Sequence, residues 1–326
     1  MQKHALVTGG AGFIGSHLCE RLVAEGWRVT ALDDLSTGRR SNLRALDGAP
    51  GFRFVNGDAG DRVIVSELVA DADAVFHLAA VVGVKKVMEN TVGTIKRNVH
   101  ATEVVLDAAA VFGKRTVITS TSEVYGESAE AAFREDDVSI IGNSRHRRWC
   151  YAATKLLDEF YAYAHFHASN LPVTVVRLFN TIGPRQVGHY GMVVPNFVQA
   201  ALAGAPLVVH GDGAQSRCFT SVHDVVRAIY ELSLRPEAAG QTYNIGRDEE
   251  ISINDLASLV VRLTESRSEI VHRGYAEIFG ENFVDLQRRR PDDSRLAALL
   301  GWRPQTPLAD TLREIIAAFR AGEGHV

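Results

Sequence analysis

The sequence predicts an α/β protein with a doubly wound parallel sheet and a smaller, mixed α/β lobe toward its C-terminal end. Two features of the sequence favour this fold class. Short β-rich runs alternate with helical patterns over the first half of the chain, and such alternation produces crossover units and a parallel sheet covered by helices on both faces. In addition, a glycine-rich turn, Gly9–Gly15, joins the first strand directly to the first helix.

The predicted elements follow one another in a regular order. Strands are expected at Ala5–Thr8, Arg28–Asp33, Phe52–Asn56, Ala74–Leu78, Thr116–Ser120 and Val173–Phe179. Helices are expected at Phe13–Glu25, Val99–Phe112, Tyr151–Ala168, His223–Leu234, Ile253–Leu263 and Pro307–Phe319. Loops are marked by Gly183-Pro184, Gly204–Pro206 and Gly211–Gly213, and Gly274–Asp293 has no clean period. We therefore expect a first domain over residues 1–179, to which part of about 213–246 returns, and a second domain over 180–326.

The composition excludes several classes of protein. The chain has 326 residues, of which 46% are hydrophobic and 23% are charged, so a largely disordered chain is excluded. The net charge of −4 argues against binding to nucleic acid or to a membrane surface. Cys19, Cys150 and Cys218 form no CxxC pair and no Cys/His cluster, so neither a disulfide scaffold nor a metal site is expected. No apolar run reaches about 18 residues, and we expect a soluble, cytoplasmic protein.

The glycine-rich turn predicts a dinucleotide site of the Rossmann type. Gly9 permits the tight turn, Gly12 lets backbone amides approach a pyrophosphate, and Gly15 lets the helix pack close to the sheet. Asp33 ends the second predicted strand, where a carboxylate binds the adenosine ribose and repels a 2′-phosphate, which favours NAD over NADP. Asp58 follows the third strand and either binds the adenine amino group or closes a simple turn.

Tyr151 and Lys155 form the predicted chemical centre. Their i, i+4 spacing places a phenol and an ammonium on one helix face. A free tyrosine has a pKa of about 10, and a nearby lysine and a positive nicotinamide ring both favour the phenolate. Tyr151 can then take the proton of a substrate hydroxyl as hydride leaves the same carbon. Thr121 follows the fifth strand, at the sheet edge where parallel sheets place their ligands, and can share the reacting oxygen.

These residues are parts of a longer set of motifs. Gly9–Gly15, Asp33, His77–Ala80, Thr121–Gly126, Tyr151–Lys155 and Arg177–Asn180 together resemble the extended short-chain dehydrogenase/reductase family, whose members modify nucleotide sugars. The resemblance covers nearly the whole chain, with the motifs in the right order. It implies an NAD-binding N-terminal domain and a C-terminal domain that binds a UDP- or dTDP-linked sugar. It also implies a homodimer through a four-helix bundle, made by Val99–Phe112 and the Tyr151 helix.

The resemblance assigns candidate residues to each role. For NAD they are Gly9, Gly12, Phe13, Ile14, Gly15, Asp33, Ser36, Thr37, Gly38, Asp58, Ala59, Leu78, Ala79, Ala80, Asn98, Tyr151 and Lys155. For the chemistry they are Thr121, Ser122, Glu123, Tyr151, Lys155 and Arg289, and for the substrate Asn180, Arg185, Arg217 and Arg289. No metal ligand is implied, and His77 is interpreted as a packing or turn residue rather than a base.

The residues after Thr121 separate three branches of this family. The 4,6-dehydratases carry an Asp–Glu pair there, and Ser122 in place of the Asp removes the general acid for dehydration. Simple 4-epimerases usually lack the glutamate at 123. The combination Thr121-Ser122-Glu123 is similar to the UDP-glucuronate decarboxylases, which include the UDP-xylose synthases and the decarboxylase half of the polymyxin-resistance enzyme.

Two further segments favour the decarboxylases. Arg148–Tyr151 resembles the Arg-Trp pair that precedes the catalytic tyrosine in the polymyxin-resistance decarboxylase. The run Gln287–Asp292 resembles a loop whose central arginine, here Arg289, reaches the active site, although an arginine run can also be a solvated loop. The hypothesis is oxidation of UDP-glucuronate at C4, loss of CO2 from the β-keto acid, and release of the UDP-4-keto-pentose or its reduction to UDP-xylose. In it, Glu123, Ser122 and Arg289 orient the carboxylate and manage the proton that arrives at C5. The alternative is a 4-epimerase of the UDP-glucuronate or UDP-glucose type, followed by a 4,6-dehydratase.

Overall fold

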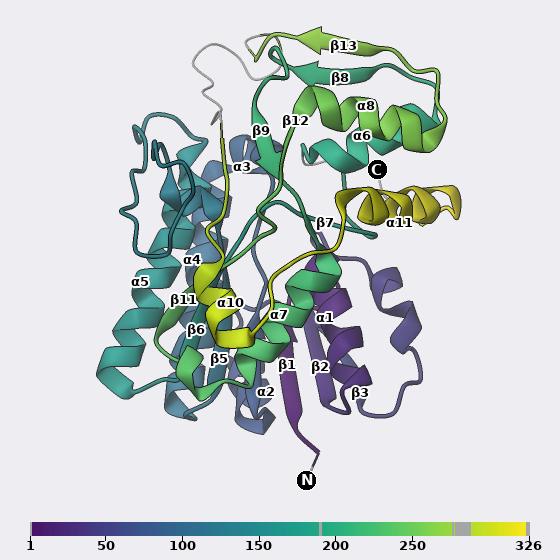
Figure 1. Ribbon diagram of the computed structural model, residues 1–326. Coiled ribbons are helices and arrows are strands. Elements are labelled where there is room, and N and C mark those ends of the chain that lie inside the picture. The colour runs from purple at the N-terminus through teal and green to yellow at the C-terminus, as the bar shows by residue number, and fades with distance from the viewer. Residues whose placement is uncertain (1, 189–190, 276, 278–287, 324–326) are drawn as a thin grey trace.

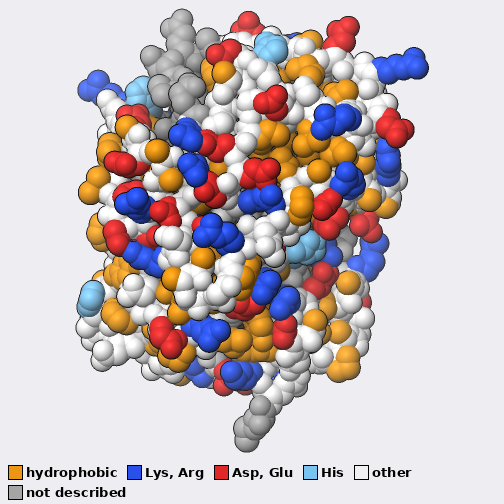
Figure 2. Space-filling view, in the orientation of Figure 1, with side chains coloured by type: hydrophobic (Ala, Val, Ile, Leu, Met, Phe, Trp, Pro, Cys, Tyr) orange, Lys and Arg blue, Asp and Glu red, His pale blue; other side chains and the backbone are white. Residues whose placement is uncertain are grey.

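The computed structural model describes residues 2–188, 191–275, 277 and 288–323, and Figure 1 shows their arrangement. Most of 274–293, including Gln287, therefore lies outside the described residues. Over the described part of the chain, no helix is long and apolar enough to cross a membrane. Figure 2 shows Lys and Arg side chains interspersed with Asp and Glu over one face, which agrees with the small net charge.

A seven-stranded parallel sheet forms the centre of the larger lobe. Its strands are β1 (His4–Thr8), β2 (Arg28–Asp33), β3 (Phe52–Asn56), β4 (Ala74–His77), β5 (Arg115–Thr121), β6 (Val173–Leu178) and β11 (Gln241–Ile245). Their order across the sheet is β11-β6-β5-β4-β1-β2-β3. Ala5 pairs with Val29 of β2 on one side and with Ala74 of β4 on the other. The strand order thus runs outward in both directions from β1. Sheets of this kind bind their ligands at the C-terminal ends of the strands where the order reverses, which here are β1 and β4.

Two layers of helices cover the sheet. They are α1 (Phe13–Ala24), α2 (Arg62–Asp71), α3 (Val84–Glu89), α4 (Thr91–Val111), α5 (Trp149–Ser169), α7 (Val222–Ser233) and α10 (Ser294–Leu300), with 3₁₀ turns η1 (Arg40–Leu46), η2 (Ser122–Tyr125) and η3 (Pro236–Ala238). Ala5 and Val7 pack toward α1 and α7, whereas Leu6 between them packs toward α2 and α4. This alternation along a buried strand explains why its central residues, Ala5–Val7, are all apolar.

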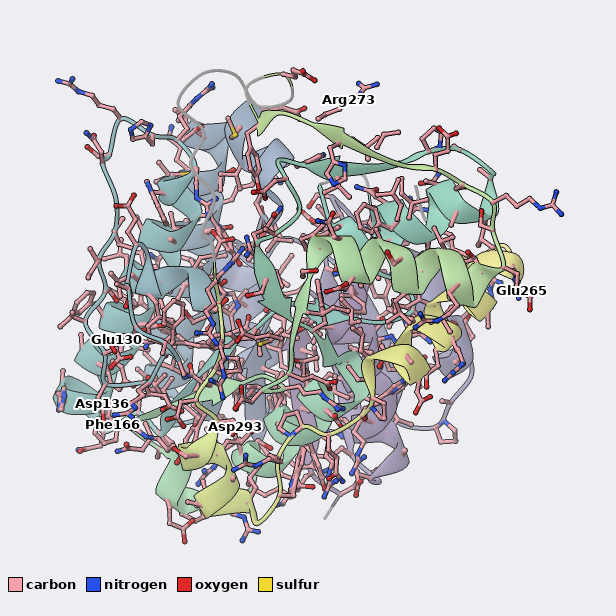
Figure 3. The ribbon with its side chains drawn as sticks, turned by 45° about the horizontal axis from the view of Figure 1, so that its top comes forward. Glu130, Asp136, Phe166, Glu265, Arg273 and Asp293 are labelled. Atoms are coloured by element: carbon pink, nitrogen blue, oxygen red, sulfur yellow. The ribbon has the colours of Figure 1, made fainter. Side chains whose placement is uncertain are left out.

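The smaller lobe lies beyond the C-terminal edge of the sheet (Figure 1). It contains β7 (Thr181–Ile182), α6 (Val193–Leu202), β8 (Leu207–His210), β9 (Ser216–Cys218), β10 (Thr220–Ser221), β12 (Glu250–Ser252), α8 (Ile253–Thr264), β13 (Ile270–Arg273) and α11 (Leu308–Arg320). Helices α6, α8 and α11 enclose a separate apolar core with β8. Figure 3 labels Glu265 at the C-terminal end of α8 and Arg273 at the end of β13.

The predicted α/β fold class is confirmed, and the differences lie at element ends and in the smaller lobe. Helix α4 begins at Thr91, not near Val99, because the Asn90 side chain caps it by accepting a hydrogen bond from Gly93 N at 3.0 Å. Helix α6 was not predicted from the sequence. It contains Pro195 in its first turn, where a missing N–H costs nothing. Strands of two to four residues in this lobe are too short for a periodic signal.

Candidate active site

One cavity of about 540 Å³ extends from the glycine turn, across the C-terminal edge of the sheet, to the smaller lobe. Most of the predicted site residues line it. They are Gly9, Gly12, Phe13, Ile14, Gly15, Asp33, Ser36, Thr37, Asp58, Ala59, Leu78, Ala79, Ala80, Asn98, Thr121, Ser122, Glu123, Tyr151, Lys155, Asn180, Arg217 and Arg289. The fold therefore gathers residues from positions 9 to 289 around a single hollow.

The glycine turn at the start of α1 is closely packed. Gly9 has φ +69°, and a Cβ there would lie 2.8 Å from the backbone N of Ala79. A Cβ on Gly15 would lie only 2.1 Å from the carbonyl oxygen of Gly9. The N-terminus of α1 can therefore approach the sheet edge and direct its unpaired amides into the cavity, and this cradle fits a dinucleotide pyrophosphate.

We predict that Gly15→Ala weakens dinucleotide binding by at least about tenfold, because the added methyl group forces the turn away from α1. Isothermal titration with NAD measures the loss. Gly26→Ala is no suitable control, since Gly26 has φ +82°. Gly274→Ala is the matched control, because a Cβ there meets no atom within 4 Å among the described residues other than its chain neighbours. Unchanged NAD affinity in Gly15→Ala would contradict the assignment.

Asp33 lies at the end of β2 with its carboxylate directed to the turn. Its oxygens accept hydrogen bonds from Ala11 N at 3.0 Å and Leu35 N at 2.8 Å. Burial raises the pKa of this carboxyl, and the two backbone donors oppose that rise. Gly38 does not line the cavity, but a Cβ on it would lie 2.8 Å from both Asp33 oxygens. A carboxylate fixed here can accept hydrogen bonds from the ribose hydroxyls of NAD, and its charge repels the 2′-phosphate of NADP.

Three other predicted residues have structural partners. Asp58 lines the cavity while its Oδ1 accepts from Gly60 N at 2.8 Å, so it closes a turn in addition to any contact with adenine. Asn98 Oδ1 accepts from Val81 N at 2.7 Å and fixes the loop after β4. His77 is buried between the hydroxyls of Thr8 and Thr102. Burial lowers the pKa of His77 to about 3, so it is neutral, as expected of a packing residue.

Tyr151 and Lys155 both line the cavity from α5. Lys155 Nζ donates to Asp158 Oδ2 at 3.1 Å, and both side chains are 3% exposed. Burial raises the pKa of Tyr151 above its usual range, and the charges of Glu123 and Asp158 add to the rise. Lys155 is thus paired with a carboxylate that the sequence motif did not include, and its effect on the Tyr151 phenol stays a prediction.

The turn after β5 places Thr121, Ser122 and Glu123 beside Tyr151. The Thr121 hydroxyl accepts from Glu123 N at 3.2 Å and caps η2, and Ser122 is buried. Arg289 Nη1 donates to Glu123 Oε1 at 3.3 Å, with exposed fractions of 12% and 16% for the two side chains. The Arg289 guanidinium and the Glu123 carboxylate therefore lie in the same cavity as Tyr151, the candidate base.

The arginine run is not simply a solvated loop. Arg288 Nε donates to Glu250 Oε1 at 2.6 Å and Arg290 Nη2 to Asp248 Oδ2 at 2.8 Å, both on the surface. Phe133 N donates to the Arg290 carbonyl at 2.9 Å and pairs this segment with another loop. With its two neighbours turned outward and paired, Arg289 alone of the three lines the cavity.

The asparagine Asn244, at the end of β11, holds these segments together. It is fully buried, and its Nδ2 donates to the carbonyls of Phe133 at 2.9 Å and Asp292 at 3.2 Å. Its Oδ1 accepts from Tyr125 OH at 2.7 Å, in the same turn as Glu123. One amide therefore fixes the Glu123 turn relative to the Arg289 loop, and sequence motifs gave no sign of it.

The substrate residues divide into two groups. Asn180 and Arg217 line the cavity, and Asn180 Nδ2 donates to the Cys218 carbonyl at 3.0 Å. Arg185 does not line it, so the cavity lining gives no support to its predicted contact with the substrate. At φ +71° its backbone turns the guanidinium toward α1, where it donates to Glu20 Oε1 at 2.6 Å. Arg148, from the Arg-Trp motif, also lines the cavity. Four further lining residues belong to no motif and were not predicted, namely Gln186, His210, Gln215 and Tyr275.

A dinucleotide cradle beside a Tyr–Lys pair defines a nicotinamide-dependent enzyme that acts on hydroxyl-bearing carbon. The family comparison agrees with this class. Residues 5–246 match the NAD dependent epimerase/dehydratase family, and the chain belongs to that family. Its cofactor is accordingly NAD, for which the glycine cradle and Asp33 provide a fitting site.

Known proteins match almost the full chain. A UDP-N-acetyl-alpha-D-glucosaminuronate decarboxylase from Bacillus cytotoxicus is 39% identical over 98% of both chains. UDP-glucuronic acid decarboxylase 1 from Danio rerio is 37% identical over 98% of this chain and 73% of its own. Among solved structures, an epimerase from Methanothermobacter thermautotrophicus has a TM-score of 0.90 and 30% identity, covering 98% of this chain and 93% of its own. The dTDP-glucose 4,6-dehydratase DesIV from Streptomyces venezuelae, solved with NAD, has a TM-score of 0.88 and 30% identity, over 98% of both chains.

Proposed function

We propose that this protein is an NAD-dependent decarboxylase of UDP-linked hexuronic acids, with UDP-glucuronate as the first candidate substrate. The observation that carries the proposal is the Glu123–Arg289 pair beside Tyr151. An arginine fork binds a carboxylate through two parallel hydrogen bonds, so Arg289 fits a substrate whose C6 is a carboxylate. Relatives named as decarboxylases of two UDP-hexuronates support the same reading.

The mechanism follows from the positions of the side chains. Bound NAD supplies the acceptor for the C4 hydride and can return that hydride later. Tyr151 takes the proton of the C4 hydroxyl, with the Thr121 hydroxyl sharing the oxygen. The C5–C6 bond then breaks, its electron pair moves toward the C4 carbonyl, and CO2 leaves. Arg289 orients the carboxylate up to that point, while Glu123 and Ser122 manage the proton that arrives at C5.

A 4-epimerase is the second candidate. It would use the same Tyr151, Lys155 and Thr121, and an epimerase is among the close structural relatives. An epimerase of UDP-glucose type has no substrate carboxylate for Arg289 to bind, and one of UDP-glucuronate type has no proton to manage at C5. For these reasons the epimerase ranks second. A 4,6-dehydratase needs a general acid where this chain has the buried Ser122.

The deciding experiment is the product mass after incubation with NAD and either UDP-glucuronate or UDP-N-acetylglucosaminuronate. Loss of one CO2 from either sugar supports the proposal. Comparison of the two substrates shows whether the enzyme accepts a hydroxyl or an N-acetyl group at C2. A further difference of two hydrogens distinguishes the reduced pentose from its 4-keto form. An isomer of unchanged mass would instead make the protein an epimerase.

We further propose that the protein works as a cytoplasmic homodimer through α4 and α5. Helix α5 exposes Leu157 and Phe160, at 49% and 66%, and the adjacent α4 exposes Val92 and Ile95 at 66% and 42%. Apolar side chains at i, i+3 on two neighbouring helices form a continuous face that a second copy can bury.

Phe160→Glu is expected to convert this dimer to monomers, because two charges would be buried at each symmetric contact. Analytical ultracentrifugation measures the mass. Val63→Glu is the matched control, since Val63 is 69% exposed on α2, outside the proposed face. Phe160→Glu that sediments as wild type, with the fold retained by circular dichroism, would rule out this interface.

A further inference from the structure

A buried acid lies on the catalytic face of α5, and no role assigned above uses it. Tyr151, Lys155 and Asp158 are spaced i, i+4 and i+7, which places them in a row on one side of the helix. Lys155 stands between the phenol and the carboxylate in this row. Its ammonium donates to Asp158 at 3.1 Å, and both residues are almost fully buried.

Asp158 is held from the other side by a chain of buried side chains. The hydroxyl of Thr102, on α4, bonds the Asp158 carboxylate. The same hydroxyl lies 3.1 Å from His77 Nε2, and His77 Nδ1 lies 2.8 Å from the hydroxyl of Thr8. Thr8 directly precedes the glycine turn, so the chain connects the dinucleotide cradle to Lys155. All its members are buried, and breaking a buried ion pair of this kind is costly.

We propose that Asp158 is a positioning residue for the Tyr151–Lys155 pair: it fixes the lysine and offsets its charge, so that Tyr151 stays a neutral phenol until NAD is bound. A lysine cation lowers the pKa of a neighbouring phenol, and a carboxylate on that cation cancels much of the effect. The added positive charge that makes Tyr151 a base is then that of the oxidised cofactor. The proposal rests on the roles given above to Tyr151 and Lys155.

The other charged groups around the row do not replace Asp158. His77 of β4 is neutral, since burial lowers its pKa to about 3. Glu123 of η2 pairs with Arg289. Glu159, the neighbour of Asp158 on α5, is bound by Arg177 at 2.7 Å and by the Ser120 hydroxyl. Lys155 is therefore left with Asp158 as the carboxylate that bonds it among the described residues.

The test is an ultraviolet titration of tyrosinate in the cofactor-free protein. The signal of Tyr151 is isolated by subtracting the curve of Tyr151→Phe from that of each Tyr151-containing protein, in the same background. Asp158→Asn is expected to move the ionisation of Tyr151 to lower pH by at least about one unit, and Asp158→Glu to restore the wild-type curve. An ionisation that stays in place in a folded Asp158→Asn protein overturns the proposal.

Wild-type protein provides a second measurement if Asp158→Asn does not fold. Without NAD, Tyr151 is expected to ionise above the value of about 10 for free tyrosine, and saturating NAD is expected to move it downward. An ionisation at or below the free value in the cofactor-free wild type contradicts the proposal. Neither titration contains a sugar, so each result stands whether or not the decarboxylase proposal holds.

Discussion

Arg289→Met is expected to slow release of CO2 by at least about 30-fold while the protein still oxidises the C4 hydroxyl. Methionine keeps the bulk of the side chain but cannot bind the substrate carboxylate or Glu123, which Arg289 contacts at 3.3 Å. Truncating one partner of a fully buried charged pair typically costs ~2–5 kcal/mol. The Glu123–Arg289 pair is partly buried, so the lower end of this range applies, which corresponds to a loss of about 30-fold. Tyr151, Lys155 and Thr121 are untouched, so reduced cofactor should accumulate instead of pentose.

Two measurements on Arg289→Met distinguish decarboxylation from oxidation at C4. Mass spectrometry of the sugar measures decarboxylation, and nicotinamide absorbance measures the oxidation at C4. Arg288→Met is the matched control, because the adjacent Arg288 binds Glu250 at the surface, and its loss should leave both readings near wild type. Full CO2 release by Arg289→Met, or an equal loss in Arg288→Met, would remove Arg289 from the mechanism.

The part of the site that could be predicted from the sequence consists of residues in local sequence patterns. The glycine turn and the Tyr151–Lys155 spacing each lie within a single turn or helix, where sequence distance determines geometry. Asp33 was found for a related reason, because it ends a strand that pairs directly with β1. Each of these residues lines the cavity, and so does every predicted catalytic residue.

The rest depended on tertiary packing. Arg185 is next to the Gly183-Pro184 loop in the sequence, but its left-handed backbone turns it to Glu20. Asn244 bonds partners more than 100 residues away, at Tyr125 and Phe133, and no local pattern records such contacts. Asp158 stood within the inspected helix, yet its importance depends on burial beside Lys155, which spacing alone does not show.

Tyr151→Phe is expected to reduce oxidation and decarboxylation together, by about 10²–10⁴-fold, because no group then takes the C4 proton. The benzene ring remains, so packing around the cavity and binding of NAD should be preserved. The variant thereby differs from Arg289→Met, in which the two readings separate. Stopped-flow absorbance of the nicotinamide measures the first half-reaction, and sugar mass measures the second.

Tyr163→Phe is the control for loss of a partly buried phenol hydroxyl from the same helix. Tyr163 OH bonds Thr242 of β11, within the sheet core, and its removal should affect stability more than rate. If Tyr151→Phe retained rapid C4 oxidation, the proton would have to leave through another group, and the Thr121 hydroxyl beside it would be the next candidate. If both tyrosine variants lost activity equally, disruption of α5 rather than loss of a base would explain the effect, and melting temperatures would distinguish the two causes.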